Sequence, residues 1–183
     1  MAPIPQTHPL RRWFAGLVED SFQKQIGLGD PSLLDYIVDL LTEFIHVERI
    51  NLLGDGSRRR IEEVAEMVSE VEIGPTATTE DRRRAVHRHI GDFTLFWTGV
   101  YPENLKRLQR KQAADFLLNY LDQGKRSYAI ASRLSSDDSR PPASVLSTLS
   151  HEFEYCVYGL GLVRKEWERT DPAGLTRIDQ LWR

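Results

Sequence analysis

The sequence contains a single cysteine, Cys156, among its 183 residues. One thiol excludes an internal disulfide and any zinc site built from several cysteines, and it fits a reducing compartment. The chain also lacks a run of about 20 apolar residues, which a membrane-spanning helix requires. The apolar stretch after Arg11 and Arg12 ends at Glu19, too early for the core of a signal peptide. We therefore expect a cytoplasmic protein that does not span a membrane.

An excess of charge of one sign is also missing. The formal net charge is −3, so the chain has no general attraction for nucleic acid or for anionic lipid. Basic residues cluster in three places, at residues 58–60, at residues 82–84 with Arg88, and at residues 106–111. Acidic residues beside the first two clusters dilute their charge, which is typical of a solvated face. The composition does not predict nucleic-acid binding.

The motifs of the common catalytic and metal sites are missing as well. There is no glycine-flanked serine and no glycine-rich phosphate loop. Glu43-x-x-His46 has the spacing of a di-iron bundle, but such a site needs a second copy, which the sequence lacks. Cys156 falls on a helical packing seam, where a thiol is normally inert. We therefore predict no catalytic residue, no metal and no cofactor.

What the sequence does contain is helical periodicity between nearly all of its helix breakers. It predicts an all-α protein, a single-domain bundle of about six main helices with a buried central helix. The expected helices cover about residues 10–26, 31–49, 61–74, 79–101, 113–134 and 149–167. The single domain is expected to cover residues 1–183, with an extended arm at 1–9 and a short C-terminal helix at 173–183.

The expected central helix is rich in aromatic residues toward its end. On a helical wheel, one apolar stripe contains Val86, Ile90, Phe93, Trp97 and Val100. Leu95 points the opposite way, between Gly91 and Thr98, so a second helix could approach on that far side. This pattern predicts a helix that is amphipathic at its start and buried all round near its end.

His89 and Asp92 form the first candidate site. Asp92 lies three residues beyond His89, within reach of its side chain on a helix. A carboxylate partner fixes the tautomer of an imidazole and favours its charged form, as acid–base chemistry or metal binding requires. The alternative is a structural pair that ties the helix to its neighbour. His87 diverges from His89 by about 200° on a helix, so we expect His87 to face outward.

Glu152 is the second candidate, because it falls near the centre of the apolar seam of the last long helix. A carboxylate there needs a cationic partner, a proton or water. The structural interpretation pairs it with an arginine or a histidine from another helix. The functional interpretation is a small polar pocket lined by His89, Asp92 and Glu152, with a hollow beside Gly159.

Residues 91–103 read Gly-Asp-Phe-Thr-Leu-Phe-Trp-Thr-Gly-Val-Tyr-Pro-Glu. This segment resembles a signature, Gly-Asp-x-x-Leu-Phe-x-x-Gly-x-x-Pro-Glu, of an uncharacterised bacterial all-helical family. Members continue with a helix that holds a tyrosine and a Gly-x-x-x-Tyr element, similar to Tyr120 and to Gly124 and Tyr128 here. The resemblance covers residues 84–134 and implies an all-helical bacterial protein, with no activity that could be transferred.

Two classes of function fit these observations. The first is a non-enzymatic helical module that binds a protein partner or associates with itself, which the missing catalytic set favours. The second is a small-molecule-binding protein or enzyme with a polar pocket near His89, Asp92 and Glu152. The two differ in whether these three side chains meet within about 5 Å around a cavity or each have separate structural partners.

Overall fold

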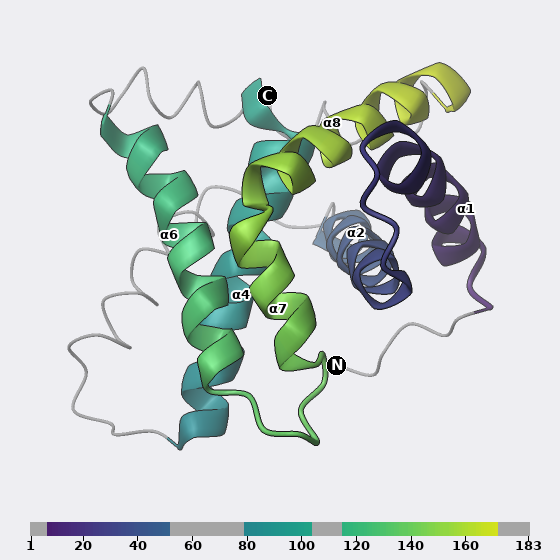
Figure 1. The fold of residues 1–183 in the computed structure, drawn as a ribbon. Helices are drawn as coiled ribbons and strands as arrows, with labels where there is room; N and C mark the ends of the chain where they lie inside the picture. Colours follow the sequence, from purple (N-terminus) through teal and green to yellow (C-terminus); the bar gives the residue numbers. More distant parts are fainter. Residues whose placement is uncertain (1–6, 52–78, 104–114, 172–183) are drawn as a thin grey trace. The chain divides into compact units, whose positions relative to one another are not determined.

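The computed structural model describes residues 7–51, 79–103 and 115–171. Its α-helices are α1 (Pro9–Val18), α2 (Pro31–Asn51), α4 (Glu80–Val100), α6 (Asp115–Arg133), α7 (Ala143–His151) and α8 (Phe153–Thr170), and a π-helical segment, η1 (Glu19–Gln25), directly follows α1 (Figure 1). These ranges contain no strand, which confirms the all-α fold class. None of the helices described is long and apolar enough to cross a membrane.

Several sequence predictions lie outside the described residues. They are the helix expected at 61–74, the short C-terminal helix at 173–183, most of the N-terminal arm, and the basic clusters at 58–60 and 106–111.

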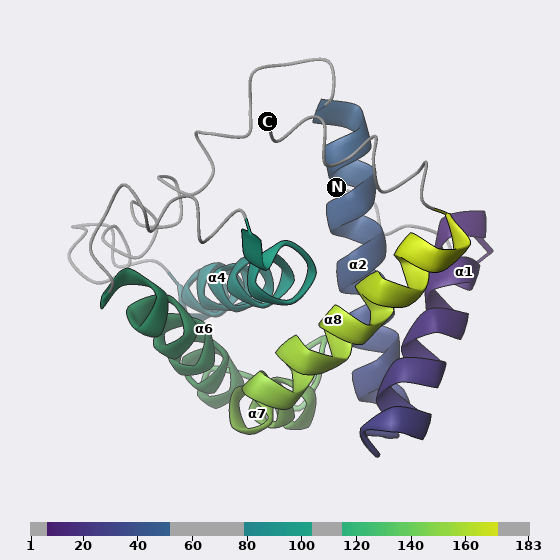
Figure 2. The same cartoon turned by 90° about the horizontal axis from the view of Figure 1, so that it is seen from above.

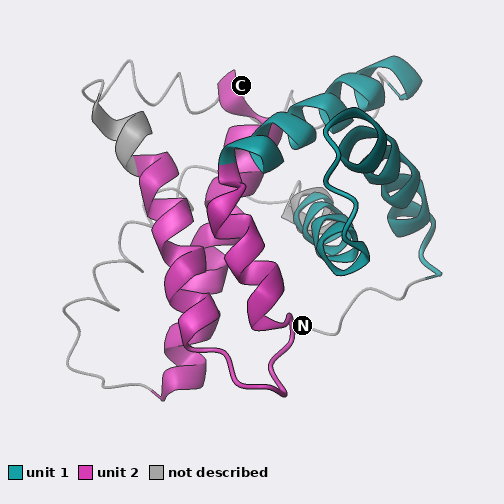
Figure 3. Cartoon of the chain, viewed as in Figure 1, with its two compact units in different colours: residues 1–55, 154–183 teal, residues 56–153 magenta. Residues whose placement is uncertain are grey.

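Contacts divide the chain into two compact units, residues 1–55 with 154–183 and residues 56–153 (Figure 3). In the first unit, α1 packs against α2 and also against α8. In the second unit, α6 packs against both α4 and α7, and α4 and α6 lie side by side in both views (Figures 1 and 2). The expectation of one undivided domain stays a prediction.

The first expected helix is present but changes form near its end. At Glu19 the α-helix continues as a π-helix, which runs to Gln25. Gly27 ends the segment with a φ of +76°, a conformation that glycine adopts without steric penalty. The N–H of Leu28 then donates to the carbonyl oxygen of Phe22 at 3.0 Å, which satisfies one of the last free carbonyls of the helix.

The start of α2 follows directly from its first two residues. The Oδ1 atom of Asp30 accepts a hydrogen bond from the N–H of Leu33 at 2.9 Å, and Pro31 takes the first helical position. Proline fits there because the N–H that it lacks would have no helical partner. This start agrees with the helix expected from residue 31.

Aromatic rings join α1 to α8 in the core of the first unit. The ring of Trp167 meets the rings of Trp13 and Phe14 edge to face, with centroids 5.7 and 5.5 Å apart. This geometry places the positive edge of one ring on the negative face of the other. The predicted seam on α8 is buried, as Cys156, Leu160, Val163 and Trp167 show.

Gly159 lets a ring of η1 lie directly on the backbone of α8. A Cβ atom built at Gly159 would lie 2.7 Å from Cζ of Phe22 and 3.0 Å from Cδ1 of Ile26. The space beside Gly159, predicted as a hollow near Glu152, is therefore occupied by the Phe22 ring.

A buried arginine also holds α1 on α2. The Nε atom of Arg11 donates to Asp39 at 2.7 Å and its Nη2 atom to Asp35 at 3.2 Å. Burial by itself would lower the pKa of Arg11, but the hydrogen bonds and charges of Asp39 and Asp35 outweigh it and raise that pKa. Asp35 and Asp39 are four residues apart and therefore lie on the same side of α2, where both are exposed. Arg11 is the residue of α1 that contacts them.

The contact at Gly159 gives the first prediction. Gly159→Ala forces the Phe22 ring to move, so we expect a loss of roughly 1–3 kcal/mol in the free energy of unfolding. Gly16→Ala is the matched control, because a Cβ atom on this exposed glycine of α1 meets nothing within 4 Å. That control should gain up to about 1 kcal/mol from helix propensity. Urea unfolding followed by circular dichroism measures both, and a Gly159→Ala protein as stable as wild type would contradict the contact.

Candidate functional site

The buried surface of α4 extends beyond the stripe that hydrophobicity predicts. A second row follows helical spacing, and all of its members are buried: Arg84, His87, Gly91, Thr94 and Thr98. Arg84, Gly91 and Thr94 contact α6 or the loop that follows it. We call this row the small-polar face of α4. Because the apolar stripe is buried as well from Ile90 onward, the prediction of a buried central helix is confirmed.

The exposure of the two histidines differs from the prediction. His87 is only 3% exposed, because it lies on the small-polar face one turn after Arg84 and one turn before Gly91. His89 is exposed, and its ring centroid lies 6.5 Å from that of Phe93. The outward position expected for His87 is wrong, whereas the divergence of the two rings is confirmed.

Asp92 receives a hydrogen bond from another helix. The hydroxyl of Tyr128 on α6 donates to Oδ1 of Asp92 at 2.8 Å. On its own helix, Nε of Arg88 lies 3.7 Å from Oδ2 of Asp92, whose side chain is 13% exposed. The carboxylate is thus compensated by a hydroxyl donor and a cation, as a largely buried charge requires.

Gly91 explains how Tyr128 reaches this carboxylate. A Cβ atom at Gly91 would lie 2.7 Å from Cδ1 and Cε1 of the Tyr128 ring, so the ring lies directly on the backbone of α4. Tyr128 itself is fully buried. We call Gly91, Asp92 and Tyr128 the tyrosine lock. The lock joins the Gly-Asp pair at positions 91 and 92 to the tyrosine of the Gly-x-x-x-Tyr element.

Gly124, one turn before Tyr128, gives the same two helices a second close contact. A Cβ atom there would lie 2.7 Å from both Cγ2 of Thr94 and Cζ of Phe153. The groups that lie so close to Gly124 are side chains, one from α4 and one from the first residue of α8. The hydroxyl of Thr94 donates to the Ile90 carbonyl at 2.7 Å, so its methyl group is left for the contact with Gly124.

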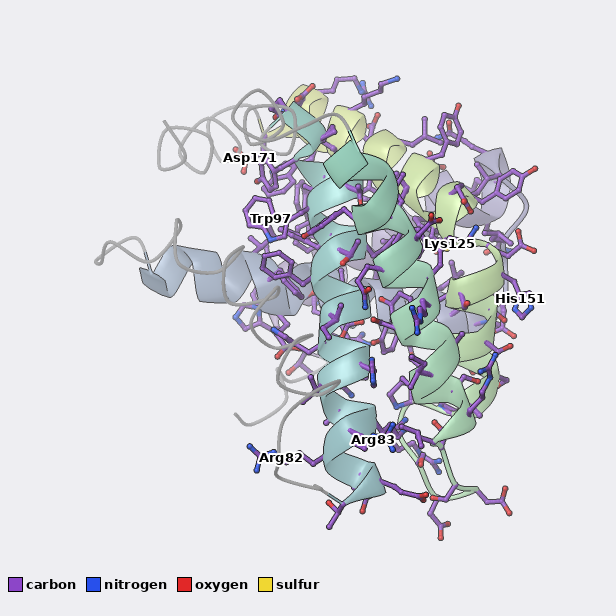
Figure 4. All side chains as sticks on the ribbon, turned by 90° about the vertical axis from the view of Figure 1, so that its left-hand side faces the viewer. Arg82, Arg83, Trp97, Lys125, His151 and Asp171 are labelled. Atoms are coloured by element: carbon purple, nitrogen blue, oxygen red, sulfur yellow. The ribbon has the colours of Figure 1, made fainter. Side chains whose placement is uncertain are left out.

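Arg84 differs from the other arginines at the start of α4. Arg82 and Arg83 are exposed (Figure 4), but Arg84 is 9% exposed. Its Nε atom donates to the hydroxyl of Ser135 and its Nη2 atom to the carbonyl of Pro141, both at 2.7 Å. Arg84 therefore holds the loop between α6 and α7 against α4. Nothing in the hydrophobic pattern of the sequence distinguishes Arg84 from Arg82 and Arg83.

Tyr120 on α6 is also buried, and its sequence position does not predict that its hydroxyl lies in the interior. Burial raises the pKa of its phenol well above the ordinary value near 10, and the nearby Thr94 hydroxyl opposes this only in part. A phenol in this setting stays neutral, so it contributes to packing between α6 and α4.

Glu152 lies at an interruption of the last predicted helix. Its φ of −101° and ψ of 25° end α7, and α8 begins at the next residue, so the expectation of one continuous helix through 149–167 is wrong. The Glu152 N–H donates to the Thr148 carbonyl at 2.8 Å. The half-buried side chain makes no hydrogen bond or ion pair with a described residue, so neither joins it to His89 or Asp92.

The three predicted site residues therefore have different surroundings. His89 is exposed on α4, Asp92 belongs to the tyrosine lock, and Glu152 lies at the turn between α7 and α8. Within the part of the chain that the structure describes, no group of three or more His, Cys, Asp or Glu side chains could hold a metal ion. The polar pocket stays a prediction that no contact favours.

Comparison with family models, curated proteins and solved structures finds no match for the chain. The resemblance of residues 84–134 to a bacterial helical family stays a prediction. The fold places the chain in the class of all-helical proteins. Within it, the tyrosine lock is a polar contact that joins α4 and α6.

The tyrosine lock gives the second prediction. Tyr128→Phe removes the donor of this hydrogen bond, and Asp92→Asn replaces its charged acceptor with a neutral one, so we expect each to lower the free energy of unfolding by about 1–2 kcal/mol. Because the two groups share that bond, the double variant should lose about 1 kcal/mol less than the sum of the single losses. Urea unfolding of the four proteins gives this coupling energy. Strictly additive losses would contradict the lock.

The third prediction concerns alkaline pH. Because the folded-state pKa of Tyr120 is raised, its contribution to stability is complete below about pH 10 and is lost as pH rises toward that folded-state pKa. Tyr120→Phe removes this group, so its stability should fall less steeply above pH 10, by about 1.4 kcal/mol per pH unit. Urea unfolding between pH 9 and 11 measures the slopes, and parallel slopes for Tyr120→Phe and wild type would contradict the burial.

Proposed function

We propose that the protein is a non-enzymatic helical module that acts by protein–protein contact, and that the exposed side of α8 is its contact surface. The observation that carries this proposal is the exposure of two tyrosines on that helix. Tyr155 is 61% exposed and Tyr158 is 58% exposed, and they are the exposed large hydrophobic residues among the described side chains. Tyrosine is enriched in protein interfaces, because its ring is apolar and its hydroxyl remains hydrated.

The two tyrosines belong to one row on α8. Residues three and four apart lie on the same side of a helix, so Tyr155, Tyr158 and Leu162 form a continuous stripe. Leu162 is partly exposed. We call these three residues the α8 outer stripe. It lies on the side of α8 away from Cys156 and Leu160, which are fully buried.

The small-molecule pocket near His89, Asp92 and Glu152 is the weaker candidate. The hydroxyl of Tyr128 occupies Oδ1 of Asp92, so this oxygen would have to lose a structural bond before it could bind a ligand. No contact of Glu152 with a described side chain brings it into the same cluster. These placements favour contact through the helix surface.

Site-specific photo-crosslinking tests the proposal in cells. A benzoylphenylalanine at position 158 should give one discrete adduct on irradiation, because it lies in the contact surface. The same residue at position 126, an exposed position on α6, is the matched control and should give none. Leu162→Asp should abolish the adduct at 158, since a charge in the stripe opposes apolar contact. No adduct at 158, or equal adducts at both positions, would reject the proposal.

A further inference from the structure

The exposed side of α8 continues beyond its aromatic half with the spacing of a helix-pairing seam. Residues 155, 158, 162, 165 and 169 alternate in steps of three and four, and they are Tyr, Tyr, Leu, Lys and Arg. Steps of three and four keep one side of a helix facing a nearly parallel or antiparallel partner helix. The steps therefore indicate a helix as the partner.

The charges along this side change sign from one end to the other. Glu154 is exposed at the start of α8, and Lys165 is exposed three turns later. Arg169 pairs with Glu166, and Arg164 pairs with Glu168, so these four charges are compensated within the helix. The exposed side thus has a glutamate near its start, an aromatic and aliphatic middle, and a lysine near its end.

We infer that the partner of the α8 outer stripe is the α8 helix of a second copy of this chain, paired antiparallel about a two-fold axis near residue 160. This inference rests on the proposed function. In a two-fold interface the same patch serves both copies, so the patch has to complement its own reversed image. The exposed side of α8 does so, because reversal places Glu154 of one copy against Lys165 of the other.

Helix geometry gives the pairs across the axis. With the axis at residue 160, Glu154 lies about 9 Å and Lys165 about 7.5 Å from it along the helix, at 1.5 Å per residue. An antiparallel pairing therefore brings Glu154 of one copy to Lys165 of the other, twice per dimer. Tyr158 meets Leu162 at the centre by the same symmetry.

Tyr155 adds a second interaction with the same lysine. Its distance from the axis places it beside Lys165 of the other copy, where the ammonium group can lie on the ring face. A parallel pairing would instead oppose Glu154 to Glu154 and Lys165 to Lys165, which is repulsive. The charge order along α8 therefore selects the antiparallel arrangement.

A charge-exchange experiment on the purified full chain tests the inference. We expect wild type to form a concentration-dependent dimer in sedimentation velocity, weakened by salt. Glu154→Lys and Lys165→Glu each place like charges across both symmetric pairs, so each should raise the dissociation constant about tenfold or more. An equal mixture of the two variants restores both pairs and should dimerise like wild type, as should the double variant. Arg126→Glu on α6 is the matched control and should change nothing.

The outcomes separate this inference from the proposed function. A monomeric wild type at all concentrations, or a mixture that stays as weak as its components, would overturn the pairing of two copies. If the chain is monomeric and position 158 still gives its discrete adduct in cells, the proposed function stands and the inference fails. Absence of both the dimer and the adduct would reject both.

Discussion

The close approach of α4 and α6 is the constraint on which the second unit depends. Each helix has a glycine where the other supplies a bulky group: the Tyr128 ring lies on Gly91, and Thr94 lies at Gly124. The polar contacts at this interface require the same register, because the hydroxyl of Tyr128 reaches Asp92 only while its ring lies on Gly91. A shift of either helix by one turn would break both contacts and bury the carboxylate without its donor. Glycine, aspartate and tyrosine therefore specify one relative position of the two helices.

Buried charge has a similar role elsewhere in the chain. Arg84 holds a loop with three side-chain donors, and Arg11 joins α1 to α2 through two aspartates. A charge in such a place is stabilising only with its partners present, because desolvation would otherwise dominate. These residue types would attract attention as candidates for binding or catalysis, but here their geometry serves folding. Function is therefore better sought where large side chains lie outside the core, on α8.

Periodicity and capping residues predict much of this fold. The start of α2 at Asp30 and Pro31, the glycine at the end of η1 and the buried seam of α8 all follow from local rules that the sequence displays. The small-polar face of α4 could not be found in this way, because hydrophobicity ranks His87 and Thr94 as surface residues. The matching glycine and tyrosine of α6 make that face an interior one. No glycine or proline marks the end of α7 at Glu152, so the sequence predicts one helix that continues past this residue.

Residues that join helices and residues proposed for contact thus lie in different parts of the sequence. The polar residues near 84–98 hold helices together, and two large aromatic side chains, Tyr155 and Tyr158, are exposed on α8. Hydrogen exchange measured on the purified chain at low and high protein concentration tests this separation most directly. The predicted result is strong protection of α4 amides at both concentrations and added protection of residues 154–165 only at the high one, because α8 pairs there. Added protection confined to α4 around Asp92, with none on α8, would contradict it.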